Sequence, residues 1–209
     1  MKTVLYLLRH GATEANLARP PWIQGRKHDL PLARLGIRQA ELTRDFLAIR
    51  PIEHCYSSPL LRAVQTAAIV AEAHGLSPVV LESLTECDGG RWEGLDWQTI
   101  RGRDAEMYQR FLENPAEHGY PEGESLRDVY ERVSPTLEEL LTRHAGEAVL
   151  VVGHHGVHQA YLAGLLGLPL NQARQVTVDN CGISIVIRQG RETTVNTLNA
   201  AFHLQGIAA

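Results

Sequence analysis

The chain has 209 residues, of which 44% are hydrophobic and 21% charged, and its formal net charge at pH 7 is −4. This length is sufficient for one large domain with a proper hydrophobic core. The slightly acidic balance excludes a general nucleic-acid-binding protein, which is normally basic, so any anionic ligand has to be bound by local positive charge.

Strand-like and helix-like segments alternate along the chain, which is typical of an α/β domain. In chain order we predict a strand at 3–8, a helix at 32–49, a strand at 54–57, a helix at 58–74, a strand at 78–81, a helix at 104–113, a helix from 125 to near 146, a strand at 148–152, a helix that ends before Pro169, and strands at 176–178, 183–187 and 193–197. Ser58 is predicted as the N-cap of the second helix, and Ser125 with Asp128 as the capping pair of the fourth.

The chain contains no linker, internal repeat or low-complexity tract, so we predict a single domain over residues 1–209. Within it, the segment around 87–123 is rich in glycine, tryptophan and charged residues and is predicted to be a lid-like insertion over a site. The three cysteines are far apart and form no CxxC pair, which indicates reduced thiols. No signal peptide or membrane-length apolar stretch is evident. We therefore expect a soluble, cytoplasmic protein that binds neither nucleic acid nor membrane; its oligomeric state stays open, a homodimer included.

Polar residues follow two of the predicted strands at the point where each strand ends. Arg9 and His10 follow the first strand, and His154 and His155 follow the strand at 148–152. In α/β sheets, ligands collect outside the carboxyl ends of the strands. Arg62 lies in the first turn of a helix, where backbone N–H groups and the helix dipole favour an anion. Two arginines, two histidines and a helix N-terminus suit a phosphate, whose oxygens the arginine fork binds bidentately.

Five motifs carry a resemblance to a known family. The segments RHGATEAN, SSPLLRAVQTA, LTECDGGRWEG, PEGES and VLVVGHHG, in this order, resemble the histidine phosphatase superfamily, also called phosphoglycerate mutase-like, over roughly Val4 to Ser184. The resemblance implies a three-layer α/β/α sandwich with a central, mostly parallel mixed sheet. It implies that His10 is the nucleophile that becomes phosphohistidine and that Glu86 is the general acid.

The resemblance also implies the rest of the site. Arg9, Arg62 and His154 complete the catalytic set around the phosphate. The candidate substrate-binding residues are Gly11, Asn16, Gln24 and His155. An ungapped alignment through VLVVGHHG places His154, and not His155, on the second histidine of the family, and a one-residue slip in the preceding strand would turn every side chain to the opposite face.

We expect no metal and no cofactor at this site. His154, His155 and His158 have helical spacing, and with Glu86 or Asp88 they form the alternative of a metal site. The neighbouring arginines, however, oppose the binding of a cation.

The resemblance therefore implies a metal-independent phosphomonoesterase that hydrolyses a small phosphorylated metabolite through phosphohistidine. The first alternative is a cofactor-dependent phosphoglycerate mutase, an isomerase, which carries a longer and more basic insertion; here Arg110 is the only Lys or Arg between Glu106 and Glu124. The second alternative, a non-catalytic phospho-ligand binding protein, would lack one of the catalytic residues, and none is missing. Sugar phosphates, phosphoglycerate derivatives, nucleotides and α-ribazole phosphate all stay open as substrates, and so does the role of the segment 17–23.

Overall fold

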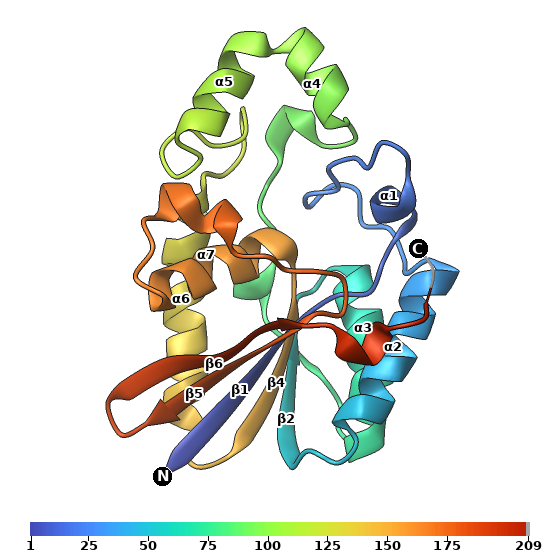
Figure 1. The fold of residues 1–209 in the computed structure, drawn as a ribbon, viewed down its shortest axis with the longest axis vertical. Helices are drawn as coiled ribbons and strands as arrows, with labels where there is room; N and C mark the ends of the chain where they lie inside the picture. The colour runs from blue at the N-terminus through green and yellow to red at the C-terminus, as the bar shows by residue number, and fades with distance from the viewer. Residues whose placement is uncertain (208–209) are drawn as a thin grey trace.

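The computed structural model describes residues 1–207 as a six-stranded sheet between two layers of helices (Figure 1). Residues 208–209, which end the predicted domain, lie outside the described residues. The strand order is β3 (Val79–Val80), β2 (Ile52–Ser57), β4 (Ala148–Gly153), β1 (Lys2–Arg9), β5 (Ile183–Gln189) and β6 (Glu192–Ala200). The first four strands are parallel, and β5 is antiparallel to both of its neighbours. The predicted α/β/α sandwich with a mostly parallel mixed sheet is confirmed.

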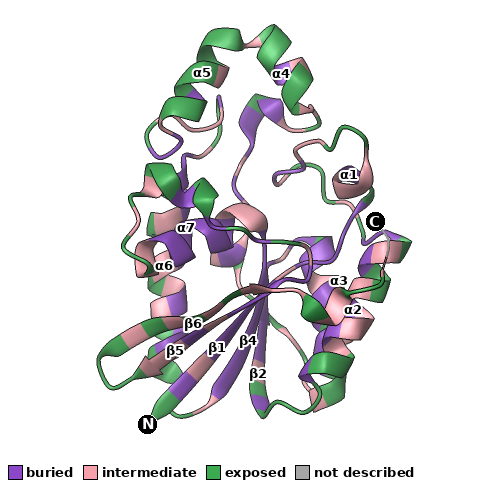
Figure 2. Ribbon diagram, viewed as in Figure 1, coloured by how far each residue is buried: buried purple, intermediate pink, exposed green. Residues whose placement is uncertain are grey.

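The two central strands are buried because their sequences are almost continuously apolar, as expected for parallel strands covered on both faces. Helices α2 (Arg34–Leu47) and α3 (Leu61–Ala71) cover one face, and α6 (Leu126–Arg143) and α7 (His155–Leu165) cover the other (Figure 1). Side chains of β1 alternate between the two faces: Tyr6 and Leu8 join the core under α2 and α3, while Leu5 and Leu7 join the core under α6 and α7. Figure 2 shows β1, β4 and the inner sides of these helices as the buried part of the molecule.

The lid stands beyond the carboxyl ends of the strands. It consists of a 3-10 helix at Gly90–Trp92, α4 (Trp97–Arg103) and α5 (Ala105–Glu113). Its buried residues Trp92, Ile100 and Phe111 form a third, separate core, and the Trp92 indole donates a hydrogen bond to Asp104 at 2.7 Å. The outer surfaces of α4 and α5 are exposed (Figure 2). The remaining short helices are α1 (Glu14–Leu17) and the 3-10 helices Glu72–His74, Glu82–Leu84, Leu170–Gln175 and Phe202–Leu204.

The predicted N-cap of the second helix is wrong, whereas the predicted capping pair of the fourth is confirmed. Helix α3 begins at Leu61, with Leu60 as its N-cap. Ser58 instead continues the sheet, because its N–H donates to the carbonyl of Val152 at 3.0 Å. At α6, Ser125 and Asp128 form a complete capping box, in which each side chain bonds the backbone of the other.

The predicted strand at 176–178 is also wrong: this segment lies beside the sheet without pairing with a strand. Its carbonyl groups accept hydrogen bonds from side chains instead. The Val176 carbonyl accepts from Gln159 Nε2 at 2.8 Å, and the Val178 carbonyl accepts from Arg9 Nη1 at 2.8 Å. The buried valines produce a strand-like pattern in the sequence, but their carbonyl groups bond side chains of the site described below and not a neighbouring strand.

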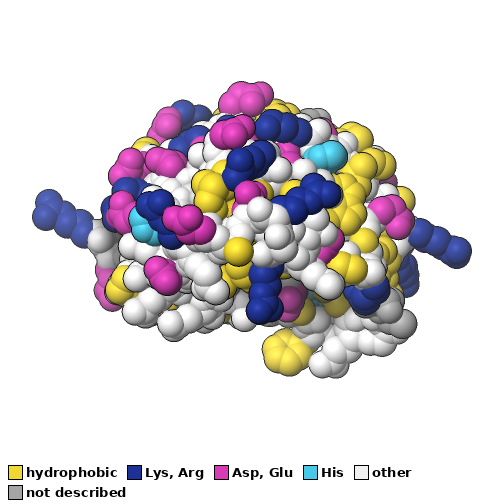
Figure 3. Space-filling view, turned by 90° about the horizontal axis from the view of Figure 1, so that it is seen from above, with side chains coloured by type: hydrophobic (Ala, Val, Ile, Leu, Met, Phe, Trp, Pro, Cys, Tyr) yellow, Lys and Arg dark blue, Asp and Glu magenta, His cyan; other side chains and the backbone are white. Residues whose placement is uncertain are grey.

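The surface of the molecule is mixed in charge. On the face seen from above in Figure 3, Lys and Arg side chains are interspersed with Asp and Glu side chains and with apolar ones. Among residues 1–207, none of the helices combines the length and the apolar character that crossing a membrane requires. Positive charge that can bind an anion must therefore be sought locally, at the ends of the strands.

Candidate active site

A cavity of about 390 Å³ opens between the carboxyl ends of the strands and the lid. Its walls come from segments that are far apart in the sequence: the end of β1, the loop 21–25, the first turn of α3, the lid, the first turn of α7 and the 3-10 helix Leu170–Gln175. The lining residues are Arg9, His10, Asn16, Pro21, Trp22, Ile23, Gln24, Gly25, Arg62, Glu86, Cys87, Trp97, Phe111, Tyr120, Leu126, His155, Gly156, Gln159 and Arg174. Most of the residues predicted for the site are therefore brought together here.

His10 lies directly after β1 and is 2% exposed. Its Nδ1 is 2.7 Å from the carbonyl oxygen of Gly11, which can only accept, so Nδ1 carries the proton and Nε2 bears the lone pair. Arg62 Nε lies 3.3 Å from that Nε2. Burial, and then the positive charges of Arg62 and Arg9, lower the pKa of His10 well below its ordinary value of 6.5. The ring is consequently neutral at pH 7, and its unprotonated Nε2 accepts a hydrogen bond from Arg62 Nε.

Each of the two arginines has one buried guanidinium nitrogen without a hydrogen-bond partner within residues 1–207. Arg62, 1% exposed, donates from Nη2 to the Gly25 carbonyl at 2.9 Å, but its Nη1 has no hydrogen-bond partner within residues 1–207 and lies 3.7 Å from Asp29. Arg9 donates from Nη1 to Val178, and its buried Nε is likewise without a partner among the described residues. Burial lowers the pKa of both guanidinium groups, which nevertheless stay charged because an arginine side chain is not deprotonated in proteins at neutral pH. Since buried polar groups are normally bonded, such donors beside a cavity indicate a site for an anion.

His154 is fully buried and is the N-cap residue of α7. Its Nε2 is 2.6 Å from Ser58 Oγ, its Nδ1 has no partner among residues 1–207, and its ring centroid is 5.2 Å from that of His10. Burial, followed by the charge of Arg62, lowers the pKa of His154 well below the usual value. The structure thus places a second neutral imidazole beside His10, in the layer behind the cavity wall.

His155 points to the other side of the same turn. It lines the cavity, and its Nδ1 lies 3.0 Å from the carbonyl oxygen of Val178, to which it donates. Burial and the charge of Arg9 lower the pKa of His155. The same two causes lower the pKa of the buried His158 to about 3. Within residues 1–207, these histidines form no cluster of metal ligands with Glu86 or Asp88. Their neutral state follows first from burial and then from the charge of Arg9, which also opposes the binding of a cation.

Glu86 reaches the cavity from the loop that leads into the lid. One carboxylate oxygen accepts from the backbone N–H of Cys87 at 2.8 Å, and the other accepts from Gly156 in the first turn of α7 at 3.4 Å. A Cβ atom on Gly156 would lie 2.9 Å from a carboxylate oxygen of Glu86, so a larger residue at position 156 would shift the carboxylate from this place. The carboxylate is held at a helix N-terminus and remains half-exposed toward the cavity.

The other predicted residues are placed in different ways. Asn16 and Gln24 both line the cavity; the Asn16 amide oxygen accepts from Thr13, while the Gln24 amide oxygen is buried without a partner among the described residues. Gly11 lies outside the lining, where its N–H donates to Thr66 Oγ1 and a Cβ would meet the Gly36 carbonyl at 2.4 Å. The segment 17–23 forms a wall of the cavity through Pro21, Trp22 and Ile23.

Sequence reasoning missed several residues of the site. Arg174 lies on the cavity wall with its guanidinium 4.2 Å from the ring centroid of Phe111, and no motif announces it. Asn180 donates to the carbonyl of His10 at 2.9 Å and so fixes the backbone at this residue. Tyr120 completes the lid side of the cavity. Arg174 is recognised as a cavity residue only because the fold brings its 3-10 helix, Leu170–Gln175, against the lid.

Comparisons with known proteins agree with this geometry. The family model of the histidine phosphatase superfamily (branch 1) matches residues 5–201. Phosphoserine phosphatase 1 of Hydrogenobacter thermophilus is 32% identical over 200 residues, which cover 96% of this chain and 93% of that protein. The probable phosphoglycerate mutase GpmB of Yersinia pestis is 35% identical over 182 residues, which cover 87% of this chain and 83% of that protein.

A solved structure shows the same fold. YhfR of Bacillus stearothermophilus matches with a TM-score of 0.88 and 29% identity, covering 97% of this chain and 100% of that chain. The family and the enzyme class predicted from the motifs are confirmed by these matches together. The chain is a phosphatase and belongs to the histidine phosphatase superfamily.

Proposed function

We propose that the chain is a metal-independent phosphomonoesterase that hydrolyses a small phosphorylated metabolite through a phosphohistidine on His10. One observation carries the proposal: a buried, neutral His10 has an unprotonated Nε2 that accepts a hydrogen bond from Arg62 Nε, and both Arg62 and Arg9 hold donors without partners among the described residues. A phosphoryl group supplies the missing acceptors, and the cavity has room for a small ester.

In the first step, the lone pair of His10 Nε2 attacks the phosphorus atom and forms an N–P bond while the bond from phosphorus to the ester oxygen breaks. The transition state carries charge on three equatorial oxygens, and catalysis consists mainly of positioning and electrostatic stabilisation. Arg9 and Arg62 supply that stabilisation with permanent positive charge. The leaving oxygen takes a proton from Glu86, which becomes a carboxylate.

In the second step, a water molecule takes the place of the alcohol product. Glu86 accepts a proton from this water as its oxygen attacks phosphorus, and the N–P bond breaks. Inorganic phosphate leaves, the electron pair returns to His10 Nε2, and Glu86 is protonated again. The two half-reactions use the same residues in reverse roles, so the cycle closes without a further group.

The substrate is proposed to be a small metabolite because the lid closes over a cavity with a mixed wall. Trp22, Trp97 and Tyr120 offer apolar and aromatic surface, and Arg174 offers one cation opposite the phosphate pocket. This cation is the observation that favours a mutase as the second candidate, since a mutase holds a second acidic group. The described residues that line the cavity include none of the arginines of the lid, which are Arg91, Arg101, Arg103 and Arg110. Phosphatase activity is therefore the better supported function.

The proposed function is tested by phosphate release from a panel of phosphomonoesters that includes phosphoserine, 3-phosphoglycerate, sugar phosphates and nucleotides. We expect turnover of at least one small ester, with the same rate in the presence of excess EDTA. A parallel assay for conversion of 3-phosphoglycerate into 2-phosphoglycerate measures mutase activity. Loss of phosphate release on addition of EDTA would contradict metal independence, and isomerisation faster than hydrolysis would identify the mutase.

The two adjacent histidines give a further test. We expect His154→Ala to lower kcat about 10²- to 10³-fold, the scale of one lost donor to a transferring group, because its ring lies 5.2 Å from that of His10. His155→Ala should mainly raise KM, since this residue lines the cavity rim and bonds Val178. Steady-state kinetics of the two variants provide the measurement. A larger loss of kcat in His155→Ala would show that the roles are exchanged.

A further inference from the structure

A second cluster of chemically active side chains lies at the end of the sheet opposite the cavity. His54 is the third residue of β2, His144 follows the last residue of α6, and Glu147 precedes the first residue of β4. The cavity is at the carboxyl ends of the parallel strands, so this cluster, near their amino ends, belongs to a different surface (Figure 1). The phosphatase mechanism uses none of its three residues.

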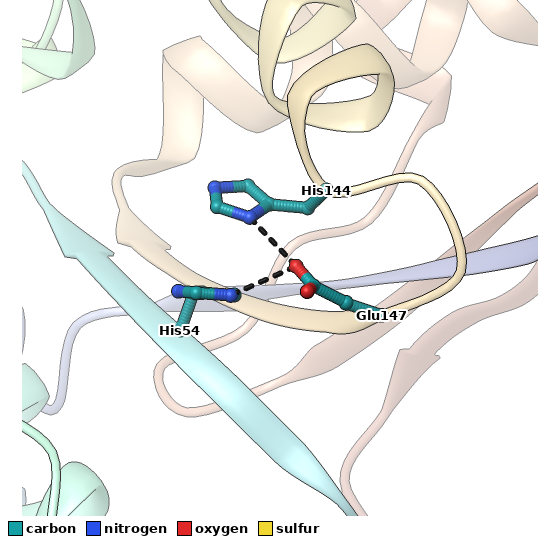
Figure 4. Close-up of side chains that lie close together, drawn as sticks. All are labelled: His54, His144 and Glu147. Carbon is teal, nitrogen blue, oxygen red and sulfur yellow. Dashed lines mark hydrogen bonds and ion pairs between the residues drawn. The ribbon is translucent and has the colours of Figure 1, made fainter.

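The three side chains converge on one point. Glu147 Oε2 lies 2.8 Å from His54 Nε2 and 3.0 Å from His144 Nδ1, and all three atoms lie within 4.8 Å of one another. Figure 4 shows both imidazole rings turned toward the carboxylate. Donors that share one Zn²⁺ at about 2.0–2.2 Å are separated by about 3.3–3.5 Å in a tetrahedron. Small rotations of His54 and Glu147 therefore bring all three donors to a common ion.

The surroundings fix one ligand and leave the others accessible. His144, whose side chain is 8% exposed, has its Nε2 2.8 Å from the hydroxyl oxygen of the buried Tyr56, which orients the ring and leaves Nδ1 for the cluster. An outer hydrogen bond of this kind is the usual companion of a metal-bound imidazole. The side chains of His54 and Glu147 are 37% and 41% exposed, so an ion can enter from solvent.

We propose that His54, His144 and Glu147 form a binding site for one divalent transition-metal ion of the Zn²⁺ type. Two imidazoles and one carboxylate are a ligand set that such ions prefer over Mg²⁺ or Ca²⁺, and water fills the remaining positions. Binding displaces any proton held on the two coordinating nitrogens.

A bound ion would join two parts of the fold that are distant in sequence: strand β2 and the turn between α6 and β4. A ligand that binds only the folded state raises its stability according to the ratio of ligand concentration to Kd. At about 100-fold excess over Kd, the Tm of a chain of this size should rise by about 5–10 °C. The site is therefore structural, and its occupancy leaves the phosphoryl-transfer chemistry untouched.

The experiment is calorimetric titration of the EDTA-treated protein with Zn²⁺ and, separately, with Mg²⁺, together with Tm measurements. We expect one tight Zn²⁺ site, the stated rise in Tm and no effect of Mg²⁺. His54→Gln and Glu147→Gln each remove one ligand from an exposed position and should weaken Zn²⁺ binding more than 10-fold. His118→Gln, a histidine in the lid and outside the cluster, should leave Kd and the rise in Tm unchanged.

Two results would overturn the proposal: the absence of a tight Zn²⁺ site in the wild-type protein, or an unchanged Kd in both His54→Gln and Glu147→Gln. The second result would place the ion elsewhere, for example on the histidines of the cavity. Phosphate release, measured in parallel, separates this proposal from the proposed function. A chain that loses the rise in Tm but keeps its EDTA-resistant turnover has lost only the metal site.

Discussion

Substitution of His10 by alanine should abolish turnover, with a loss of more than about 10⁴-fold in kcat, because it removes the proposed nucleophile. Cys87 also lines the cavity, but burial raises the pKa of its thiol well above the usual value. The His10 ring is neutral, its Nδ1–H donates to the Gly11 carbonyl, and its unprotonated Nε2 accepts a hydrogen bond from Arg62. Rapid quenching of the wild-type enzyme with a labelled ester should trap a phosphoenzyme that is labile in acid and stable in base. This behaviour is characteristic of a phosphorylated imidazole.

The matched control for this prediction is His118→Ala, which removes an imidazole from the lid and should keep wild-type kinetics. His10→Ala should still bind inorganic phosphate or vanadate, since Arg9 and Arg62 are unchanged, and this binding shows that the site is intact. Label found on serine or aspartate in the quenched wild-type enzyme would refute the assignment of the nucleophile. The same conclusion would follow from appreciable turnover in His10→Ala.

Glu86→Gln should produce the second-largest effect, and its size should depend on the leaving group. The amide keeps the shape of the side chain and can still accept from the Cys87 N–H, but it cannot donate and recover a proton. General acid catalysis contributes about 10²- to 10⁴-fold, so kcat for alkyl phosphates should fall by that factor. Hydrolysis of p-nitrophenyl phosphate should fall far less in the phosphorylation step, because p-nitrophenolate leaves without protonation.

Asp88→Asn is the matched control for Glu86→Gln. Asp88 lies two residues further along, outside the cavity lining, and its carboxylate accepts from the backbone N–H of Gly90 at 2.8 Å. We expect this variant to keep most of its activity on both classes of ester. Equal losses on both substrates in Glu86→Gln, or a larger loss in Asp88→Asn, would assign the acid to another residue.

The parts of the fold that follow from local sequence were predictable. The apolar runs of β1 and β4 and the capping box at Ser125 each specify their element within a few residues, and the resemblance then supplies the arrangement of the layers. The start of α3 was not predictable, because Ser58 is a good N-cap in isolation. Only the presence of β4 beside it reveals that its N–H belongs to the sheet.

Some residues of the candidate site were likewise predictable from the sequence, and others were not. Residues that follow strand ends, such as His10 and His154, were found because the carboxyl ends of parallel strands meet at one edge. Arg174 and Asn180 were missed because they come from irregular segments whose position depends on the whole tertiary structure. The same holds for the cluster of His54, His144 and Glu147, in which 93 residues separate the first histidine from the carboxylate.

The separate core of the lid has a consequence for how such an enzyme can diversify. Trp92, Ile100 and Phe111 stabilise the lid from within, while the residues of the phosphate pocket are anchored on the sheet and on α3 and α7. Substitutions on the cavity side of the lid can therefore alter which alcohol is accepted without a penalty to the main cores or to the reactive groups. The reaction at the phosphate can therefore stay the same while substitutions in the lid change, independently of it, which leaving group is recognised.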